Sequence, residues 1–559
     1  QLTNNRNVVL IMTVKATRVS ESKFFSLTRM GSYHSHPPSP VVETKYGKIE
    51  GRRFRHGDKY VDAYQGIPYA KPPVGELRFK KPQPPDVWDG VLETKKFPNR
   101  AIQRDLISWL DTYKKGHQSE DCLYLNVFAP SWKAPPEGFA VMVFIHGGGF
   151  SMDTATSYGD KNICETLCTK DIVFVTIQYR LGYLGFFTTG DEECPGNFGL
   201  WDQTAALQWI QDNIRAFGGN ENNVTVLGQS AGGASTDFLH LSPHSTNLFH
   251  KMIPMAGFAE ARWALSPAMV SHSKRKATSL GIEWKAANMM EELRALPAHR
   301  FGVHMFYPEK EKESDLECTP VIDGDFLPTS LEELRKRATP KPLMTGVSQL
   351  EGLLFMIIIR PSMERLEKLV HRAIPKNLPE REKIVDDFME KYKPISKDSM
   401  SIYRAMNEVY SDLAMNSYAL KLVTDTVHNY PDVPVYHYVF SHLNPKSWGP
   451  FRWYLPILEA SHCLELPYLL GKGIIFGFNF NDDDAKLCES FTTAFTNFAK
   501  YGNPNGFGDI SELSEEWKPA TEDNPARHYK FDAQPHMEEI YFENRPRQLL
   551  DLLEVASKL

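Results

Sequence analysis

The chain has 559 residues, of which 42% are hydrophobic and 24% are charged, and its formal net charge at pH 7 is -6. This length allows a large buried core, and the small negative charge forms no basic stripe, which argues against a nucleic-acid-binding protein. No apolar run approaches the roughly 18 residues of a membrane span, so we expect a soluble globular protein without a membrane helix.

The N-terminal residues 1–40 lack the patterning of a folded domain, and we expect a disordered extension that ends in a proline-rich linker. The apolar run at residues 8–12 is short and has no cleavage pattern, so it makes a poor signal peptide. The segment from Met30 to Ser35 matches the pattern for myristoylation of Gly31, which applies only if Met30 is the true start; a chance match is the alternative.

The rest of the chain, residues 41–559, carries alternating strand and helix patterns without a repeat or a flexible linker, and we expect one domain. The predicted elements are an edge hairpin at 46–51, strands at 119–127, 140–145 and 172–177, a helix at 202–217, strands at 224–229, 343–347 and 433–440 with helices between the last two, and a terminal helix at 547–554. This order is typical of an α/β fold with a large, mostly parallel twisted sheet and helices on both faces.

The seven cysteines are an odd number without repeated short spacings, in a chain too large to need disulfides for stability. Cys164 and Cys168 lie at i and i+4, but no second pair completes a zinc site, so we expect a helix face there. The sequence predicts no metal and no cofactor.

The strand at 224–229 runs into a G-x-S-x-G motif centred on Ser230, with Gly228 and Gly232 on either side. Such a turn presents a serine hydroxyl at a strand-to-helix junction, and the N–H of Ala231 then faces a developing oxyanion. A glycine-rich turn with an incidental serine is the alternative. The strand at 140–145 also ends in a glycine loop, residues 146–150, whose N–H groups can bind an anion, and this second feature favours a nucleophile.

A serine nucleophile needs a base and a group that orients the base, and these side chains usually follow strand ends. Glu351 follows the strand at 343–347, and His462 lies farther along the chain, which gives the order serine, acid, histidine. Taken alone, either residue is more often a loop carboxylate or a hydrogen-bonded histidine.

Together these motifs resemble the type-B carboxylesterases, the carboxylesterase and cholinesterase family of α/β-hydrolases. The matching segments, in family order, are residues 66–70, 119–126, 146–150, 228–232, 351–352 and 462–468. The resemblance implies an α/β-hydrolase fold, with Ser230 as nucleophile, His462 as general base and Glu351 as orienting acid. It also implies an oxyanion hole formed by the N–H groups of Gly148, Gly149 and Ala231.

The chain departs from the family pattern beside the site. Gln229 stands where the family usually has a glutamate, so a cationic ester loses an attractive partner. Ala256 replaces a serine that helps to hold the acid, which leaves water or another donor to position Glu351. The usual disulfide partner of Cys122 and the family's second loop disulfide are missing, which suits a reducing compartment.

A further departure concerns the tryptophan with which cholinesterases bind a quaternary ammonium. Its position falls near Thr112 and Tyr113, and Trp109 is out of register. The sequence therefore predicts a serine carboxylesterase that hydrolyses neutral esters of small molecules. A transacylase that uses an alcohol acceptor and a sequestering protein with slow turnover are alternatives, and a non-enzymatic adhesion protein disagrees with the intact motifs.

The segment Ser557-Lys558-Leu559 matches the S-K-L peroxisomal address, and the helix predicted before it would leave these residues projecting. Together with the missing disulfides, this motif predicts an intracellular, peroxisomal location, with the cytoplasm as the alternative.

Overall fold

The computed structural model describes residues 36–105, 116–303, 316–508 and 511–558. By its contacts, the chain from Pro38 onward is one unit, and its first strand begins at Pro38, three residues ahead of the expected domain start at 41. The predicted N-terminal extension, up to residue 35, lies outside the described residues, as does the segment that contains Trp109, Thr112 and Tyr113.

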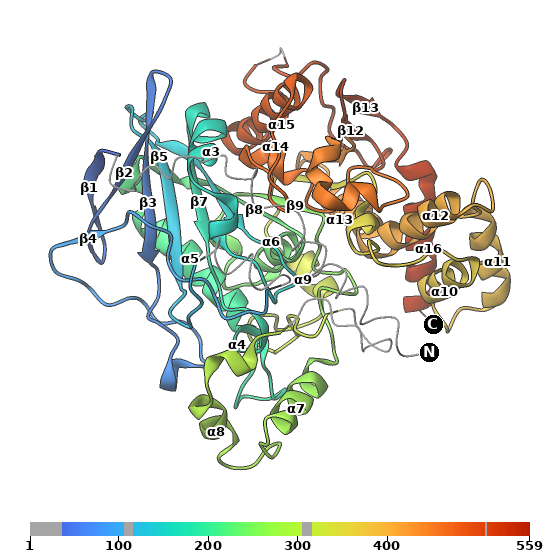
Figure 1. The fold of residues 1–559 in the computed structure, drawn as a ribbon, viewed down its shortest axis with the longest axis horizontal. Coiled ribbons are helices and arrows are strands. Elements are labelled where there is room, and N and C mark those ends of the chain that lie inside the picture. The colour runs from blue at the N-terminus through green and yellow to red at the C-terminus, as the bar shows by residue number, and fades with distance from the viewer. Residues whose placement is uncertain (1–35, 106–115, 304–315, 509–510, 559) are drawn as a thin grey trace, which may run out of the picture. The chain divides into compact units, whose positions relative to one another are not determined.

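A sheet of 13 strands organises the described part of the chain (Figure 1). The strands are β1 (Pro38–Thr44), β2 (Gly47–His56), β3 (Lys59–Pro68), β4 (Val91–Glu93), β5 (Tyr124–Pro130), β6 (Phe139–Ile145), β7 (Ile172–Ile177), β8 (Gly219–Gln229), β9 (Lys251–Met255), β10 (Leu343–Ser348), β11 (Val435–Phe440), β12 (His528–Phe531) and β13 (His536–Glu538). The predicted parallel sheet is confirmed for its centre, where β7, β6, β8, β9, β10, β11 and β12 are parallel neighbours. The sequence predicted an edge hairpin at 46–51, and the antiparallel hairpin of β1 and β2 turns there. It did not predict the antiparallel pairs β5–β7 and β12–β13.

The central strands are nearly continuous apolar runs because both of their faces are buried. Alternate side chains of β6 enter two different cores: Val141 and Val143 pack on one face, and Met142 and Phe144 pack on the other. Helices must therefore cover both faces of the sheet.

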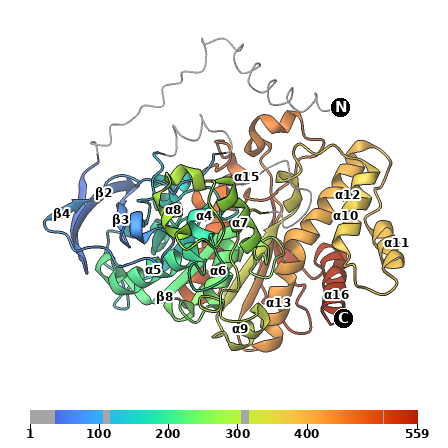
Figure 2. The same ribbon diagram turned by 90° about the horizontal axis from the view of Figure 1, so that it is seen from below.

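Helices pack around the sheet (Figure 2), and their buried side chains belong to three apolar clusters. Side chains of α5 (Phe198–Asn213), α6 (Ala231–Leu241) and α13 (Ser417–Asn429) join the first core, and those of α3 (Lys161–Thr166), α14 (Leu466–Leu470) and α15 (Asp482–Tyr501) join the second. A third apolar cluster joins α10 (Met363–Ala373), α11 (Arg381–Lys391), α12 (Ser399–Ser411) and the terminal helix α16 (Arg545–Ser557). The remaining longer elements are α4 (Gly182–Phe186), α7 (Met269–Ser279), α8 (Met289–Ala295) and α9 (Leu331–Arg337).

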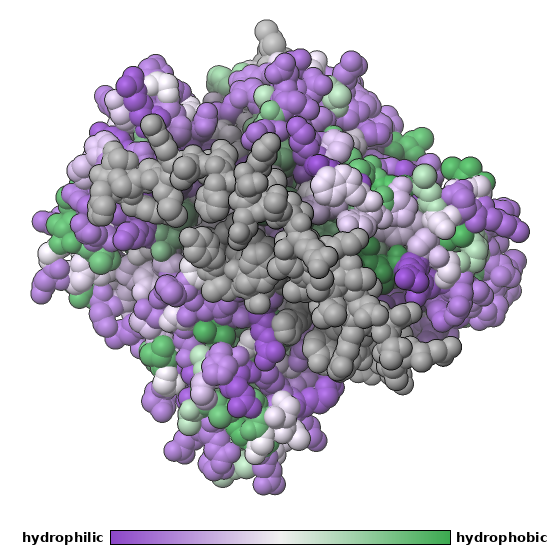
Figure 3. Space-filling model, viewed as in Figure 1, coloured by the Kyte–Doolittle hydropathy of each residue, from purple (hydrophilic) through white to green (hydrophobic). Residues whose placement is uncertain are grey.

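A mostly polar surface (Figure 3) and mostly buried cysteines are typical of a protein with a large folded core. In Figure 3 the described part of the visible face is mostly hydrophilic, with apolar residues in separate places. Among the described residues, no helix combines the length and apolar character needed to cross a membrane. All seven cysteines lie in the described part of the chain as free thiols; Cys164 lies in α3 and Cys168 in the short helical turn after it, and both are buried.

A buried ion pair fixes helix α6, which begins directly after Ser230. Asp237 of α6 accepts hydrogen bonds from Arg335 of α9 at 3.0 and 2.9 Å and a further one from the N–H of Ala259 at 3.0 Å. Burial alone would raise the pKa of Asp237, but the Arg335 guanidinium outweighs it and lowers that pKa. The pair therefore stays charged inside the protein.

Substitution of Asp237 by alanine should lower the free energy of unfolding by about 3 kcal/mol, because it leaves the buried guanidinium of Arg335 with one carboxylate partner, Glu260, in place of two. Urea denaturation measures this loss. The control is Glu332→Ala, which removes an exposed pair with Lys336 and should cost less than about 1 kcal/mol. Equal losses in the two variants would contradict a structural role for the buried pair.

Candidate active site

Ser230 lies in the sharp turn between β8 and α6. Its backbone has φ 60° and ψ −126°, a conformation that side-chain-bearing residues rarely adopt. The flanking glycines are required by contact: a Cβ on Gly228 would lie 2.3 Å from the carbonyl oxygen of Gly232, and one on Gly232 would lie 2.0 Å from that of Ile145. The predicted nucleophile elbow thus has the geometry that its sequence indicates.

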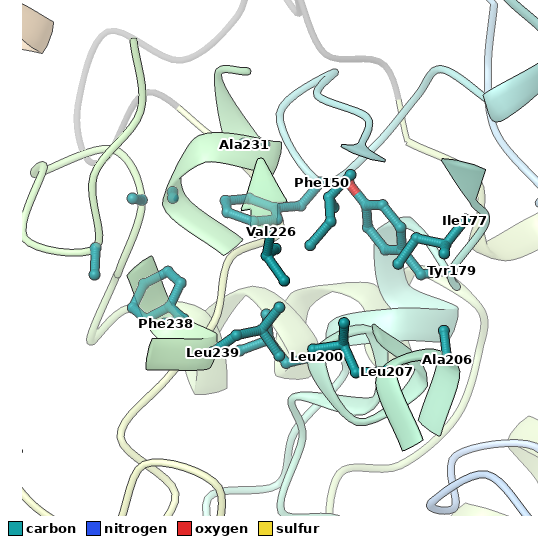
Figure 4. Close-up of a cluster of buried hydrophobic side chains, with 14 of the residues drawn as sticks. Phe150, Ile177, Tyr179, Leu200, Ala206, Leu207, Val226, Ala231, Phe238 and Leu239 are labelled. Carbon is teal, nitrogen blue, oxygen red and sulfur yellow. The ribbon is translucent and has the colours of Figure 1, made fainter. Parts of the chain in front are cut away.

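Packing beneath the turn holds this strained backbone in place (Figure 4). Val226 of β8 faces the side chains of Phe238 and Leu239 of α6 and of Leu200 of α5, and all of them belong to one core. The Ser230 N–H also donates to the carbonyl of Met255 at the end of β9, at 2.8 Å. The hydroxyl is therefore carried by a backbone that buried packing and a hydrogen bond hold in place.

The glycine loop after β6 lies directly against the elbow. A Cβ on Gly147 would lie 3.0 Å from Cβ of Ser230, and Gly148 and Gly149 have φ values of 89° and 57°. Within the described residues, the N–H groups of Gly148, Gly149 and Ala231 donate to no other group of the protein. These three N–H groups are available to an anionic ligand beside Ser230.

Glu351 and His462 come together although they are far apart in sequence. Glu351 opens the short turn after β10, and its Oε2 lies 2.5 Å from Nδ1 of His462, with both side chains buried. The other carboxylate oxygen accepts the N–H of Ser348 at 2.5 Å. Because Ala256 replaces the usual serine, the sequence left open which group positions Glu351. In the structure this donor is the backbone N–H of Ser348.

The side chain of Gln229 lies against the imidazole of His462. Its Nε2 is 3.4 Å from Nδ1 and 3.3 Å from Nε2 of that ring. The two ring nitrogens point in different directions, so an amide almost equally distant from both packs on the ring instead of occupying either lone pair. The opposite end of this amide, Oε1, accepts the thiol of Cys463 at 3.1 Å. Among the described residues no hydrogen bond joins Ser230 to His462, and such bonds often tighten only when substrate binds.

Ser230 opens into a cavity of about 420 Å³. Apolar side chains form most of its wall, and three basic side chains of α10 complete it. The lining residues are Gly149, Ser230, Trp263, Leu316, Phe355, Met356, Ile359, Arg365, Lys368, Leu369, Arg372, Met406, Tyr410 and Met415. A cavity of this size and character suits a small organic molecule with a large apolar part.

The sequence model of the carboxylesterase family matches residues 38–548 of this chain. The chain belongs to the carboxylesterase family. This carboxylesterase is 38% identical over 547 residues to Esterase cest-33 of Caenorhabditis elegans, covering 92% of this chain and 95% of that protein. It is 34% identical over 499 residues to the medium-chain fatty acyl-CoA hydrolase precursor of Anas platyrhynchos, covering 84% and 86% of the two chains. It is 32% identical over 498 residues to the cocaine esterase of Homo sapiens, covering 84% and 85%.

As a member of this family, the chain is a carboxylic ester hydrolase with an α/β-hydrolase fold. Its substrates are small-molecule esters. Of the residues predicted from sequence, the structure brings Ser230, Gly149 and their neighbours together at the elbow and hydrogen-bonds Glu351 to His462. Gln229 precedes Ser230 in the chain and contacts His462, so it connects the elbow to the hydrogen-bonded pair of Glu351 and His462.

The sequence did not reveal one buried acidic residue next to the site. Glu465 is buried near Glu351, and Ser348 donates its hydroxyl to Oε2 of Glu465 at 3.2 Å. Burial first, and then the charge of Glu351, raise the pKa of Glu465 to about 8. Glu465 therefore keeps its proton at neutral pH. Its position three residues after His462 was visible in the sequence, but its burial was not.

The raised pKa of Glu465 has a measurable consequence for stability. The folded pKa of about 8 exceeds the reference value of 4.5, so the folded state binds the extra proton and its stability falls as pH rises between these values. A Glu465→Gln variant lacks this ionisation. Compared with the wild type, the variant should therefore gain free energy of unfolding between about pH 5 and about pH 8.5, as measured by urea denaturation. A difference that stays constant with pH would contradict the shift.

Proposed function

We propose that Ser230 is the nucleophile of this carboxylesterase, that His462 is its general base and that Glu351 orients and stabilises the imidazole. The observation that carries the proposal is the hydrogen bond from Nδ1 of His462 to Oε2 of Glu351 at 2.5 Å, next to a serine held in a strained elbow. A carboxylate on Nδ1 keeps the proton on that nitrogen and leaves Nε2 to accept the serine proton.

The reaction then follows from these positions in two steps. His462 takes the hydroxyl proton of Ser230 as the oxygen attacks the ester carbonyl, and the N–H groups of Gly148, Gly149 and Ala231 stabilise the oxyanion. The histidine next protonates the departing alcohol, which leaves an acyl group on Ser230. In the second step His462 activates water, which releases the acid and restores the serine.

We further propose that neutral esters with large apolar groups are the preferred substrates over cationic ones. The support is a cavity wall that is mostly apolar and that carries basic groups. Gln229, beside the nucleophile, adds no negative charge that would attract an ammonium group. The name of one relative, a fatty acyl-CoA hydrolase, describes a substrate with an apolar acyl chain.

The peroxisomal location expected from Ser557-Lys558-Leu559 stays a prediction, and Leu559 lies outside the described residues.

Ser230→Ala and His462→Ala should each lower kcat/KM for 4-nitrophenyl butyrate by at least about 10⁴-fold, and the double variant should be little worse, because the residues act as one unit. Far-ultraviolet circular dichroism checks that each variant folds, and Ser279→Ala, on the exposed side of α7, is the matched control with full activity. Additive losses, or near-normal turnover by Ser230→Ala, would refute the assignment.

The same assay, with its early phase resolved, separates this proposal from its alternatives. A burst followed by steady hydrolysis is the expected course. A burst that stops would indicate a sequestering protein, and formation of a new ester when an alcohol is added would indicate a transacylase.

A Gln229→Glu variant should raise kcat/KM for butyrylthiocholine relative to its neutral 3,3-dimethylbutyl analogue, because it adds a negative charge beside Ser230. The control is Gln208→Glu, which makes the same change of charge on the exposed side of α5. An unchanged ratio of the two substrates in Gln229→Glu would mean that other groups determine the potential in the site.

A further inference from the structure

Cys463 directly follows His462 in the chain, and its thiol contacts the residue that precedes Ser230. The backbone of Cys463 has φ 70°, in the left-handed region that residues with side chains rarely adopt. In this conformation its Sγ–H donates to Oε1 of Gln229 at 3.1 Å. One hydrogen bond therefore links the residue after the histidine to the residue before the serine.

The surroundings of Cys463 keep its thiol protonated. Burial first, and then the nearby carboxyl groups of Glu465 and Glu351, raise the pKa of Cys463 well above its usual value. A thiol with a raised pKa is a poor nucleophile, but it remains a hydrogen-bond donor. At neutral pH the group that faces Oε1 of Gln229 is therefore an S–H and not a thiolate.

This donor determines how the amide of Gln229 is oriented. The two ends of an amide are similar in size, so its hydrogen bonds decide which end is the oxygen. Because Oε1 accepts the thiol, the amide nitrogen is the end that lies against His462, 3.4 Å from Nδ1 and 3.3 Å from Nε2 of the ring. A hydrogen bond with the same amide lowers the pKa of Glu465, which is the effect of a nitrogen that donates to a carboxyl group.

The opposite orientation of the amide would interfere with the general base. It would place a carbonyl oxygen beside Nε2 of His462, where a small rotation of the ring would point an N–H at it. Such a hydrogen bond stabilises the imidazole with its proton on Nε2, whereas the general base needs that nitrogen without a proton. An amide nitrogen accepts no hydrogen bond, so it leaves Nε2 available to the proton of Ser230.

We propose that Cys463 is a positioning residue of this esterase: its thiol holds the Gln229 amide with the nitrogen toward His462, and so keeps Nε2 of the imidazole free to accept the proton of Ser230. The inference rests on the proposed function, in which His462 is the general base. Cys463 is not among the residues that line the cavity. Its effect therefore belongs to the chemical steps, through Gln229, and not to the binding of the ester.

The first test removes the thiol in two ways and measures kcat and KM for 4-nitrophenyl butyrate. Cys463→Ala keeps a side chain on the left-handed backbone, and Cys463→Gly relieves that strain, so an effect that both variants share comes from the lost thiol. Both should lower kcat about fivefold, the loss of one hydrogen bond, with KM unchanged. Cys463→Ser keeps a donor and should recover most of the activity.

The matched control is Cys194→Ala. It removes another buried thiol that donates a hydrogen bond, to the carbonyl oxygen of Phe187 at 3.4 Å, outside the cavity wall. This variant should keep the kcat of the wild type, and far-ultraviolet circular dichroism checks the folding of every variant. If Cys463→Ala does not fold, Cys463→Gly and Cys463→Ser decide: a low kcat in the first and a recovered one in the second support the inference, and equal values overturn it.

A double-mutant cycle tests whether the thiol acts through the amide. Gln229→Met keeps the length of the side chain but has no amide to orient. In that background the addition of Cys463→Ala should change kcat by less than about twofold. A fivefold loss in both backgrounds would overturn the inference, because the thiol would then act on the fold or on His462 directly.

The outcomes separate this inference from the proposed function. A full kcat in both Cys463→Ala and Cys463→Gly, while His462→Ala is inactive, would overturn the inference and leave the proposed function intact. Normal hydrolysis by His462→Ala would overturn the proposed function, whatever the thiol variants do.

Discussion

The active site depends on the crowding of backbone at the end of the central strands. Three strands of the parallel sheet end here: the carbonyl of Ile145 at the end of β6, the turn after β8 and the end of β9 meet without space for a side chain. A Cβ on Gly257 would lie 1.8 Å from the carbonyl oxygen of Ser230, and one on Gly232 would lie almost as close to Ile145. Glycines allow this approach, and the approach fixes the backbone of Ser230 in a conformation that it would not adopt alone.

The consequences of this constraint extend outward from the elbow. Helix α6 starts at the turn, and a buried ion pair holds it at Asp237. The helix that follows the strained Ser230 backbone is therefore fixed in position. The glycine loop lies against the turn, which brings its N–H groups to the serine. The turn after β10 carries Glu351, and a separate loop carries His462. Their side chains meet in a hydrogen bond.

A second constraint is the burial of acidic groups behind the histidine. Glu351 and Glu465 share Ser348 as a hydrogen-bond donor, one by its backbone and one by its hydroxyl. Two adjacent buried carboxyl groups do not both ionise at neutral pH, and the raised pKa of Glu465 identifies it as the protonated one. Glu465 is then a neutral neighbour of Glu351, whose other carboxylate oxygen lies against the imidazole of His462.

The sequence predicted those features that depend on local pattern. Apolar runs indicated the central strands because both faces of a parallel sheet are buried, and the glycine spacing indicated the elbow because its crowding is local. The donor to Glu351 depends on the course of the backbone after β10. The antiparallel pairing of β5 with β7 and the protonated Glu465 depend on contacts between distant segments. The same is true of the cavity, whose wall combines Trp263, Leu316 and Met406.

The central claim is that the ester's acyl group passes through Ser230. The most direct measurement is mass spectrometry of the enzyme quenched during the first turnover of a 4-nitrophenyl ester, followed by peptide mapping. Hydrolysis through an acyl-enzyme should give one acyl group per chain, on the peptide that contains Ser230, and this group should disappear as turnover is completed. An acyl group on another residue, such as Cys463, or steady hydrolysis through no covalent intermediate at all, would contradict it.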